Sequence, residues 1–135
     1  MDGRLTLTVV TPERALLQGF ACDEVTLPAW LGELGVLPGH TPLIALLGIG
    51  VVAYRDGARR AALAVRGGFV EIAGDAVRIL ADEAAAPEAI DGAKASAEKA
   101  EAESRRGRAA GDEELDAANA DARFAEARLA VLRPA

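Results

Sequence analysis

The stretch GELGVLPGHTPL, from Gly32 to Leu43, places glycines and prolines between apolar residues. Both residue types favour turns, because glycine adopts positive φ and proline fixes φ. Leu34, Val36 and Leu37 give the same segment an apolar character. The pattern predicts a loop of defined shape.

The residues around this stretch show the period of β-strands. Leu5, Leu7 and Val9 alternate with Thr6 and Thr8, which is typical of a strand with one buried face. Further short apolar runs lie at 22–27, 49–55, 60–65, 69–73 and 76–81. We expect each of these runs to form a strand.

Turn signals separate the runs. Asp56-Gly57, Gly67-Gly68 and Gly74-Asp75 each place a glycine where a hairpin or bulge needs a positive φ. Short strands punctuated in this way are typical of a β-sandwich or a small barrel. Residues 1–86 are therefore predicted to form a β-sandwich domain, a length that buries enough surface for independent folding.

The pattern changes near Pro87, where charged residues become more frequent and the period becomes helical. Two series recur at spacings of three and four, which place residues along one side of a helix. They are Ile90, Ala93, Ala97, Ala100 and Ser104, then Leu115, Ala118, Ala122, Ala125, Leu129 and Leu132. Residues 87–135 are predicted to form an antiparallel two-helix hairpin, which makes the fold class α+β.

The connection and the seam of this hairpin are both weak points. Gly111 can end one helix and Asp112 can cap the next, although a single long helix is the alternative, since each glycine costs only about 1 kcal/mol. The seam is mostly alanine. Burial of its one methyl group contributes about 0.8 kcal/mol of stability, whereas burial of a leucine side chain contributes roughly 1.5 to 3 kcal/mol. We therefore expect a hairpin that packs weakly and moves.

Composition excludes several partners and sites. A net charge of −6 argues against binding to nucleic acid or to an anionic membrane surface. Cys22 is the only cysteine, which rules out an internal disulfide and a multi-cysteine metal site and fits a reducing cytoplasm. The N-terminus has no signal-peptide pattern, and the longest apolar run, 43–53, is about half a membrane span.

Enzyme motifs are also missing from the sequence. Ser96 and Ser104 are the only serines and His40 is the only histidine, so a Ser-His-Asp triad is not expected. There is no GxxxxGK[ST] loop and no recognisable metal-ligand spacing. The sequence predicts a non-catalytic protein without a cofactor or metal.

Residues 32–43 closely resemble the GELGxxPGHxPL signature of the epsilon subunit of ATP synthase, which mitochondria call delta. Residues 66–83, RGGFVEIAGDAVRILADE, resemble that family's GGxxEV strand pair, which leads into its LAD element. The family's order, a β-sandwich followed by a two-helix hairpin, agrees with the order expected here.

The resemblance implies a non-catalytic rotor subunit in the central stalk of a proton-translocating ATP synthase, held at the cytoplasmic face of the membrane only through the complex. Its β domain would bind the gamma subunit and the c-ring. Its hairpin would lie folded on the β domain or extend along gamma toward the catalytic alpha and beta subunits, and so modulate ATP hydrolysis. One alternative is a nucleotide-sensing module that binds ATP in the hairpin. Another is an unrelated adaptor, which would need secretion or a membrane anchor.

Candidate contacts with the c-ring follow from the matching loop. The resemblance implies that Glu33 and His40 face the ring, although Glu33 in a solvated loop and His40 hydrogen-bonded within the turn are the alternatives. Trp30 and Leu31 precede the loop, and exposure there would indicate a subunit contact, whereas burial is the alternative.

Two further candidates lie in the hairpin. Residues 90–95, IDGAKA, resemble the I/L-D-x-x-R-A motif through which some bacterial epsilon subunits bind ATP, with matches at Ile90, Asp91 and Ala95. Lys94 stands at the arginine position and lacks the planar contact that arginine makes with phosphate, so an ordinary first helical turn is the alternative.

Three arginines crowd the tip of the expected hairpin. In the family, basic helix residues meet an acidic segment of the catalytic beta subunit, so the resemblance implies an electrostatic contact through Arg105, Arg106 and Arg108. A solvated tip is the alternative.

Overall fold

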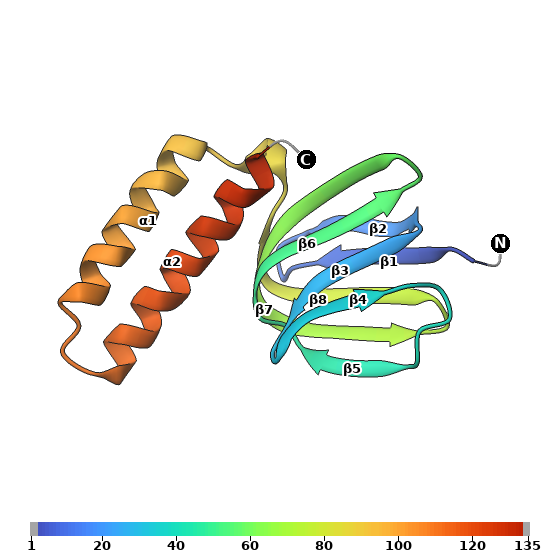
Figure 1. The fold of residues 1–135 in the computed structure, drawn as a ribbon, viewed down its shortest axis with the longest axis horizontal. Coiled ribbons are helices and arrows are strands. Elements are labelled where there is room, and N and C mark those ends of the chain that lie inside the picture. The colour runs from blue at the N-terminus through green and yellow to red at the C-terminus, as the bar shows by residue number, and fades with distance from the viewer. Residues whose placement is uncertain (1–2, 134–135) are drawn as a thin grey trace.

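The computed structural model describes residues 3–133 and contains eight strands followed by two helices (Figure 1). The strands are β1 (Leu5–Val10), β2 (Ala15–Cys22), β3 (Glu24–Ala29), β4 (Gly32–Val36), β5 (Leu43–Leu46), β6 (Ile49–Asp56), β7 (Arg59–Ala73) and β8 (Ala76–Ala85). A 3-10 turn η1 (Pro87–Ala89) leads into α1 (Gly92–Gly107) and α2 (Asp112–Leu132). The predicted α+β order, a β-sandwich followed by an antiparallel helical hairpin, is confirmed.

The core of the sandwich follows the alternation seen in the sequence. Leu5, Leu7 and Val9 of β1 are fully buried, whereas Thr6 is exposed. Val77 and Ile79 of β8 are buried in the same way. Because every second residue points inward, the two layers enclose an aliphatic core built from valine, leucine and isoleucine.

The long strand β7 belongs to both layers. Its first half pairs with β6, from Arg59 opposite Asp56 to Arg66 opposite Ile49. Its second half pairs with β5, from Phe69 to Ile72. Strand β8 follows β7 in antiparallel register along nearly its whole length, so both strands pass from one layer to the other.

The remaining strands complete the two layers. The hydrogen-bonded order is β2-β1-β8-β7-β6-β3-β4, with β5 added to β7. One layer contains β2, β1 and β5 together with the second half of β7. The other contains β4, β3 and β6 together with the first half of β7. The pair β1 and β8 is parallel, while the other strand pairs are antiparallel.

Three local predictions about strands need correction. The segment Gly32–Leu43 is not a single loop, because its first residues form β4 and its last residue begins β5. Strand β2 was not predicted, since it is a mostly exposed edge strand and lacks alternation. Runs 60–65 and 69–73 are one strand, with Gly67-Gly68 as an irregularity inside it and not a turn.

The ends of the helices depend on specific polar groups. Asp91 caps α1, because its Oδ1 accepts a hydrogen bond from the Lys94 backbone N–H at 3.1 Å. Helix α2 begins at Asp112 with Gly111 as its N-cap, so Asp112 is not the cap that the sequence suggested. The strands end at Ala85, and the division into domains 1–86 and 87–135, with independent folding of the first, stays a prediction.

The seam between the helices was predicted in part for one helix and wrongly for the other. On α2, Ala118, Ala122 and Ala125 are buried as expected, whereas Leu115 and Leu132 at the two ends of the expected series are exposed. On α1, the expected series Ala93, Ala97, Ala100 and Ser104 is exposed, and Ala95 and Ala102 are buried instead. Alanine occurs on several sides of α1, so spacing alone does not identify the packed side.

The bend in β7 makes a prediction about stability. Gly68 has a φ of +115°, and a Cβ there would lie 2.0 Å from the Leu80 carbonyl oxygen. We expect Gly68→Ala to lower the unfolding free energy by about 3 kcal/mol or more, because positive φ and a clash with rigid backbone act together. Gly35→Ala is the control, since a Cβ there meets nothing within 4 Å, and its effect should stay near about 0.5 kcal/mol. Urea unfolding measures both, and equal stabilities would contradict this account.

Candidate functional site

Helix α2 packs on the outer face of β6 and β7. Phe124 and Ala127 are buried against Ala64, and Ile49, Val51 and Val131 pack around them. As a result Leu63, Ala64 and Val65 are all buried, so both faces of β7 are covered at this point. Sequence analysis missed this face of α2, although the spacing of Phe124, Ala127 and Val131 is a helical one.

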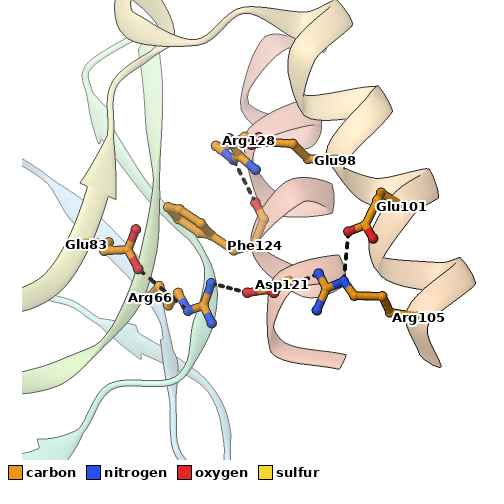
Figure 2. A network of polar contacts seen from close by, with 8 residues as sticks. All are labelled: Arg66, Glu83, Glu98, Glu101, Arg105, Asp121, Phe124 and Arg128. Atoms are coloured by element: carbon orange, nitrogen blue, oxygen red, sulfur yellow. Dashed lines mark hydrogen bonds and ion pairs between the residues drawn. The ribbon is translucent and has the colours of Figure 1, made fainter. Parts of the chain in front are cut away.

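Arg66 on β7 joins the sandwich to the hairpin (Figure 2). Its Nη1 lies 2.8 Å from Oδ1 of Asp121 on α2, and its Nε lies 3.7 Å from Oε2 of Glu83 on β8. Its guanidinium carbon is also 5.9 Å from the centre of the Phe124 ring, within the range of a cation–π contact. The same arginine therefore touches both parts of the chain.

Asp121 is shared between the sandwich and the hairpin. Arg105 of α1 places Nη2 2.8 Å from Asp121 Oδ2, while Arg66 holds the other carboxylate oxygen. Burial alone would raise the pKa of Asp121, but hydrogen bonds from Arg105 and Arg66 outweigh burial and hold the pKa below its ordinary value. Asp121 therefore stays charged at neutral pH.

The three arginines predicted at the tip have different surroundings. Arg105 is half-buried and also places Nε 2.7 Å from Oε1 of Glu101, so it is engaged within the hairpin. Arg106 and Arg108 are exposed, with contacts to Asn119 at 3.4 Å and to Ser104 at 2.6 Å. Arg106 and Arg108 are the tip cations that remain accessible to a partner.

The residues of the ATP-like motif serve the start of α1. The Asp91 carboxylate caps the helix, Ala95 is fully buried, Ile90 is half-buried and Lys94 is exposed. The arrangement matches the alternative of an ordinary first turn.

The groove beside this turn is lined by equal numbers of basic and acidic side chains. They are Arg66, Lys94, Arg105 and Arg128 together with Glu83, Glu98, Glu101 and Asp121. The three arginines each hold a carboxylate within 3 Å. A triphosphate would have to displace these carboxylates, so the groove is not a preformed phosphate site.

An apolar row crosses the outer face of the other layer. Leu46, Phe69 and Leu80 are direct neighbours on β5, β7 and β8, and they are 48%, 53% and 53% exposed. Paired residues on adjacent strands point to the same face, so the three side chains lie side by side. Contiguous exposed apolar side chains make this row a candidate contact surface. We call Leu46, Phe69 and Leu80 the apolar row; sequence analysis did not identify it.

Trp30 and Leu31 form the tip of the hairpin between β3 and β4, next to this row. They are 70% and 95% exposed, so the alternative of burial is wrong. The Trp30 N–H donates to the Leu46 carbonyl oxygen at 2.9 Å, which places the tip beside the apolar row. Glu33 follows on β4 and is exposed.

His40 lies in the loop that connects β4 to β5. Its backbone N–H donates to the Leu37 carbonyl oxygen, and its ring Nδ1 lies 2.7 Å from the Thr41 carbonyl oxygen. Both hydrogen bonds are local, as the alternative of a histidine hydrogen-bonded within the turn predicts. Since Glu33 is the second residue of β4 and His40 follows the end of β4, the structure places the two residues toward opposite ends of that strand.

Residues 3–133 offer no reactive thiol and no metal-ligand cluster. Cys22 is buried, and burial raises the pKa of its thiol, which keeps it in the unreactive protonated form. Within this range no three His, Cys, Asp or Glu side chains gather as a metal-ligand set. No helix in the described part of the chain is long and apolar enough to cross a membrane.

Comparison of the sequence with known proteins identifies the family of this chain. A family model described as the beta-sandwich domain of the ATP synthase delta/epsilon chain matches residues 4–87. The chain belongs to the ATP synthase delta/epsilon family. An "ATP synthase epsilon chain" from Solibacter usitatus is 48% identical over 105 residues, which cover 76% of this chain and 78% of the relative. An "ATP synthase epsilon chain" from Symbiobacterium thermophilum is 40% identical over 101 residues, which cover 75% of this chain and 73% of that relative.

Solved structures extend the likeness to the hairpin. A chain of the Euglena gracilis mitochondrial ATP synthase, described as OSCP/F1/c-ring, superposes with a TM-score of 0.83 at 22% identity over 98% of this chain and 84% of that chain. A chain of the Tetrahymena thermophila mitochondrial ATP synthase, described as central stalk/c-ring, superposes with a TM-score of 0.54 at 16% identity. This superposition covers 64% of this chain and 69% of that chain. The first superposition spans nearly the whole chain, so the sandwich and the hairpin together form a known fold.

The loop that carries His40 is tied to the rest of the sandwich by Asp75. Its Oδ1 accepts a hydrogen bond from the Gly39 N–H at 2.7 Å, although Asp75 itself has a positive φ of 65°. Asp75→Gly should relax the backbone and release the loop, so the Gly39 amide should exchange about five- to tenfold faster while global stability changes by about 1 kcal/mol at most. NMR hydrogen exchange measures this.

Asp75→Asn is the matched control, because asparagine keeps an oxygen acceptor and also tolerates positive φ. Its Gly39 amide should exchange at close to the unmodified rate. Equal exchange in all three proteins would mean that Asp75 does not hold the loop.

Proposed function

We propose that this chain is a non-catalytic rotor subunit of the ATP synthase central stalk. In this proposal the β-sandwich binds the gamma subunit and the c-ring, and the hairpin modulates ATP hydrolysis. The chain associates with the cytoplasmic face of the membrane only through the complex. The observation that carries the proposal is the apolar row on the layer opposite the docked hairpin.

The energetics of the apolar row favour a protein partner. Full burial of a leucine or phenylalanine side chain contributes about 1.5–3 kcal/mol. Leu46, Phe69 and Leu80 are about half exposed, so each retains roughly half of that contribution for a contact. The flat outer face of a sheet suits a folded partner, and we assign this face to gamma.

The tip beside the row is the proposed contact with the c-ring. Trp30 and Leu31 are exposed there, and aromatic side chains are enriched at interfaces. Glu33 adds an exposed carboxylate close to the same tip, which suits a polar loop of the ring. His40 lies at the far end of β4, so we assign it a structural role in its loop. The assemblies that contain both solved neighbours include a c-ring, which supports this arrangement.

The far end of the hairpin is the proposed regulatory contact. Arg106 and Arg108 are exposed beside the turn that joins α1 to α2. They suit an acidic segment of the catalytic beta subunit, because opposite charges attract across a solvated contact. The groove near Lys94, which basic and acidic side chains line in equal number, offers less support for nucleotide sensing, since its arginines already hold carboxylates.

The apolar row gives a direct test of gamma binding. Leu46→Glu and Phe69→Glu should each weaken binding of purified gamma by more than about tenfold, because a carboxylate would be desolvated in the contact. Both side chains point outward, so stability should change little. Leu115→Glu is the control, since Leu115 is an exposed leucine in the hairpin. Unchanged binding by both row variants would remove the assignment to gamma.

The tip arginines give a test of regulation in the assembled enzyme. Arg106→Glu combined with Arg108→Glu should raise ATP hydrolysis by about two- to fivefold, because repulsion replaces contacts worth roughly 0.2–1 kcal/mol each. Arg14→Glu is the control, since Arg14 is exposed in the loop between β1 and β2. If hydrolysis is the same in all three enzymes, the tip does not inhibit.

A further inference from the structure

The apolar contact between the hairpin and the sandwich is small. Its buried residues are Ala64, Phe124 and Ala127 among those the structure describes, and the half-buried Ile49, Val51 and Val131 pack around them. The buried residues of α1, Ala95 and Ala102, lie in a helix that packs on α2. An interface in which two of three buried side chains end in a single methyl group leaves much of the docking to polar contacts.

Arg66 is placed to supply that polar contact. It lies between Ile49 of β6 and Glu83 of β8 in one cross-strand row on the face that α2 covers. Its side chain is half-buried, which strengthens its 2.8 Å ion pair with Asp121 relative to a fully solvated pair. The ion pairs in Figure 2 therefore run from β8 through β7 and α2 to α1.

We propose that Arg66 and Asp121 form an ionic latch that holds the hairpin on the sandwich without a bound ligand. Arg105 is a positioning residue in this latch, because its contact with Oδ2 orients the carboxylate whose Oδ1 meets Arg66. The value of the latch for regulation rests on the proposed function, but the latch itself is a property of the isolated chain.

The same contacts allow the latch to open. When the hairpin leaves, Asp121 keeps Arg105 and Arg66 keeps Glu83, so each charge retains a partner. Removing one member of a buried pair is costly because it strands the other charge. Here opening strands neither charge, so the pair favours docking while leaving release accessible.

Phe124 fills the place next to the latch. Its ring lies between two guanidinium groups, 5.9 Å from that of Arg66 and 5.0 Å from that of Arg128. Arg128 in turn holds Glu98 at 2.8 Å within the hairpin. The aromatic ring and the carboxylates thus satisfy the arginines of the groove, which is why docking needs no anionic ligand.

The test measures docking in the full-length chain in solution. When docked, the hairpin tumbles with the sandwich, and when released it tumbles faster, so ¹⁵N relaxation of α1 and α2 reports the ratio of docked to released chains. Arg66→Gln and Asp121→Asn should each lower this ratio by about three- to tenfold, the range for a partly exposed ion pair with an added cation–π contact. The double variant should lower it no further than the stronger single variant.

Salt and matched variants sharpen the result. Raising the salt from about 0.1 M to about 1 M shortens the screening length from about 10 Å to about 3 Å, so it should release the unmodified hairpin and affect the double variant much less. Asp116→Asn removes the same charge from an exposed position on α2 and should leave docking unchanged. Arg78→Gln is the matched control for Arg66→Gln, because Arg78 is an exposed arginine that pairs with Glu71 at 4.0 Å. This variant should also leave docking unchanged.

Each outcome decides between the latch and its alternatives. Docking that is unchanged in both single variants, or that falls additively in the double variant, would overturn the latch. Docking that appears only with added Mg-ATP would overturn ligand independence. These measurements need no gamma subunit or c-ring, so a failed latch leaves the rotor proposal standing, and failed gamma binding by the unmodified chain leaves the latch standing.

Discussion

The close approach of β7 and β8 at Gly68 is the constraint on which the rest of the structure depends. No side chain fits between Gly68 and the Leu80 carbonyl oxygen, and the positive φ of Gly67 and Gly68 redirects β7 at this point. One continuous strand can then pair with β6 before the bend and with β5 after it. The sandwich is therefore a single sheet folded over an aliphatic core, and its two outer faces are fixed relative to each other.

The bend also places two interaction surfaces on one strand. Arg66 precedes the glycine pair and meets the hairpin, whereas Phe69 follows it and belongs to the apolar row. Both residues lie in a strand that is paired on each side, so neither moves without disturbing the ladder. The apolar row and the surface that the hairpin covers are therefore held in a fixed relation by the same paired strand.

The sequence predicted the parts of the fold that local chemistry specifies. Alternation in β1 identified its buried side, and Gly57 and Gly74 located two turns, whereas the pair Gly67-Gly68 lies inside β7. It failed for the packed side of α1, because alanines are spread around that helix and carry no preference. It also missed the apolar row, since Leu46, Phe69 and Leu80 look like core residues until strand pairing shows that they point outward. The contact of Arg66 with Asp121 joins distant segments and has no local signal.

The alanine-rich composition of the hairpin explains why electrostatics has so large a part in its docking. Alanine favours the helix but buries little apolar surface, so α1 and α2 are well formed while their attachment is weak. Charged pairs at the edges of the interface add attraction, yet partly exposed pairs contribute only about 0.2–1 kcal/mol each. In the proposed latch, such a total would hold the hairpin without fixing it permanently. A competing surface of similar polarity would then need to offer only a comparable set of contacts, which in the proposed function the exposed Arg106 and Arg108 would make.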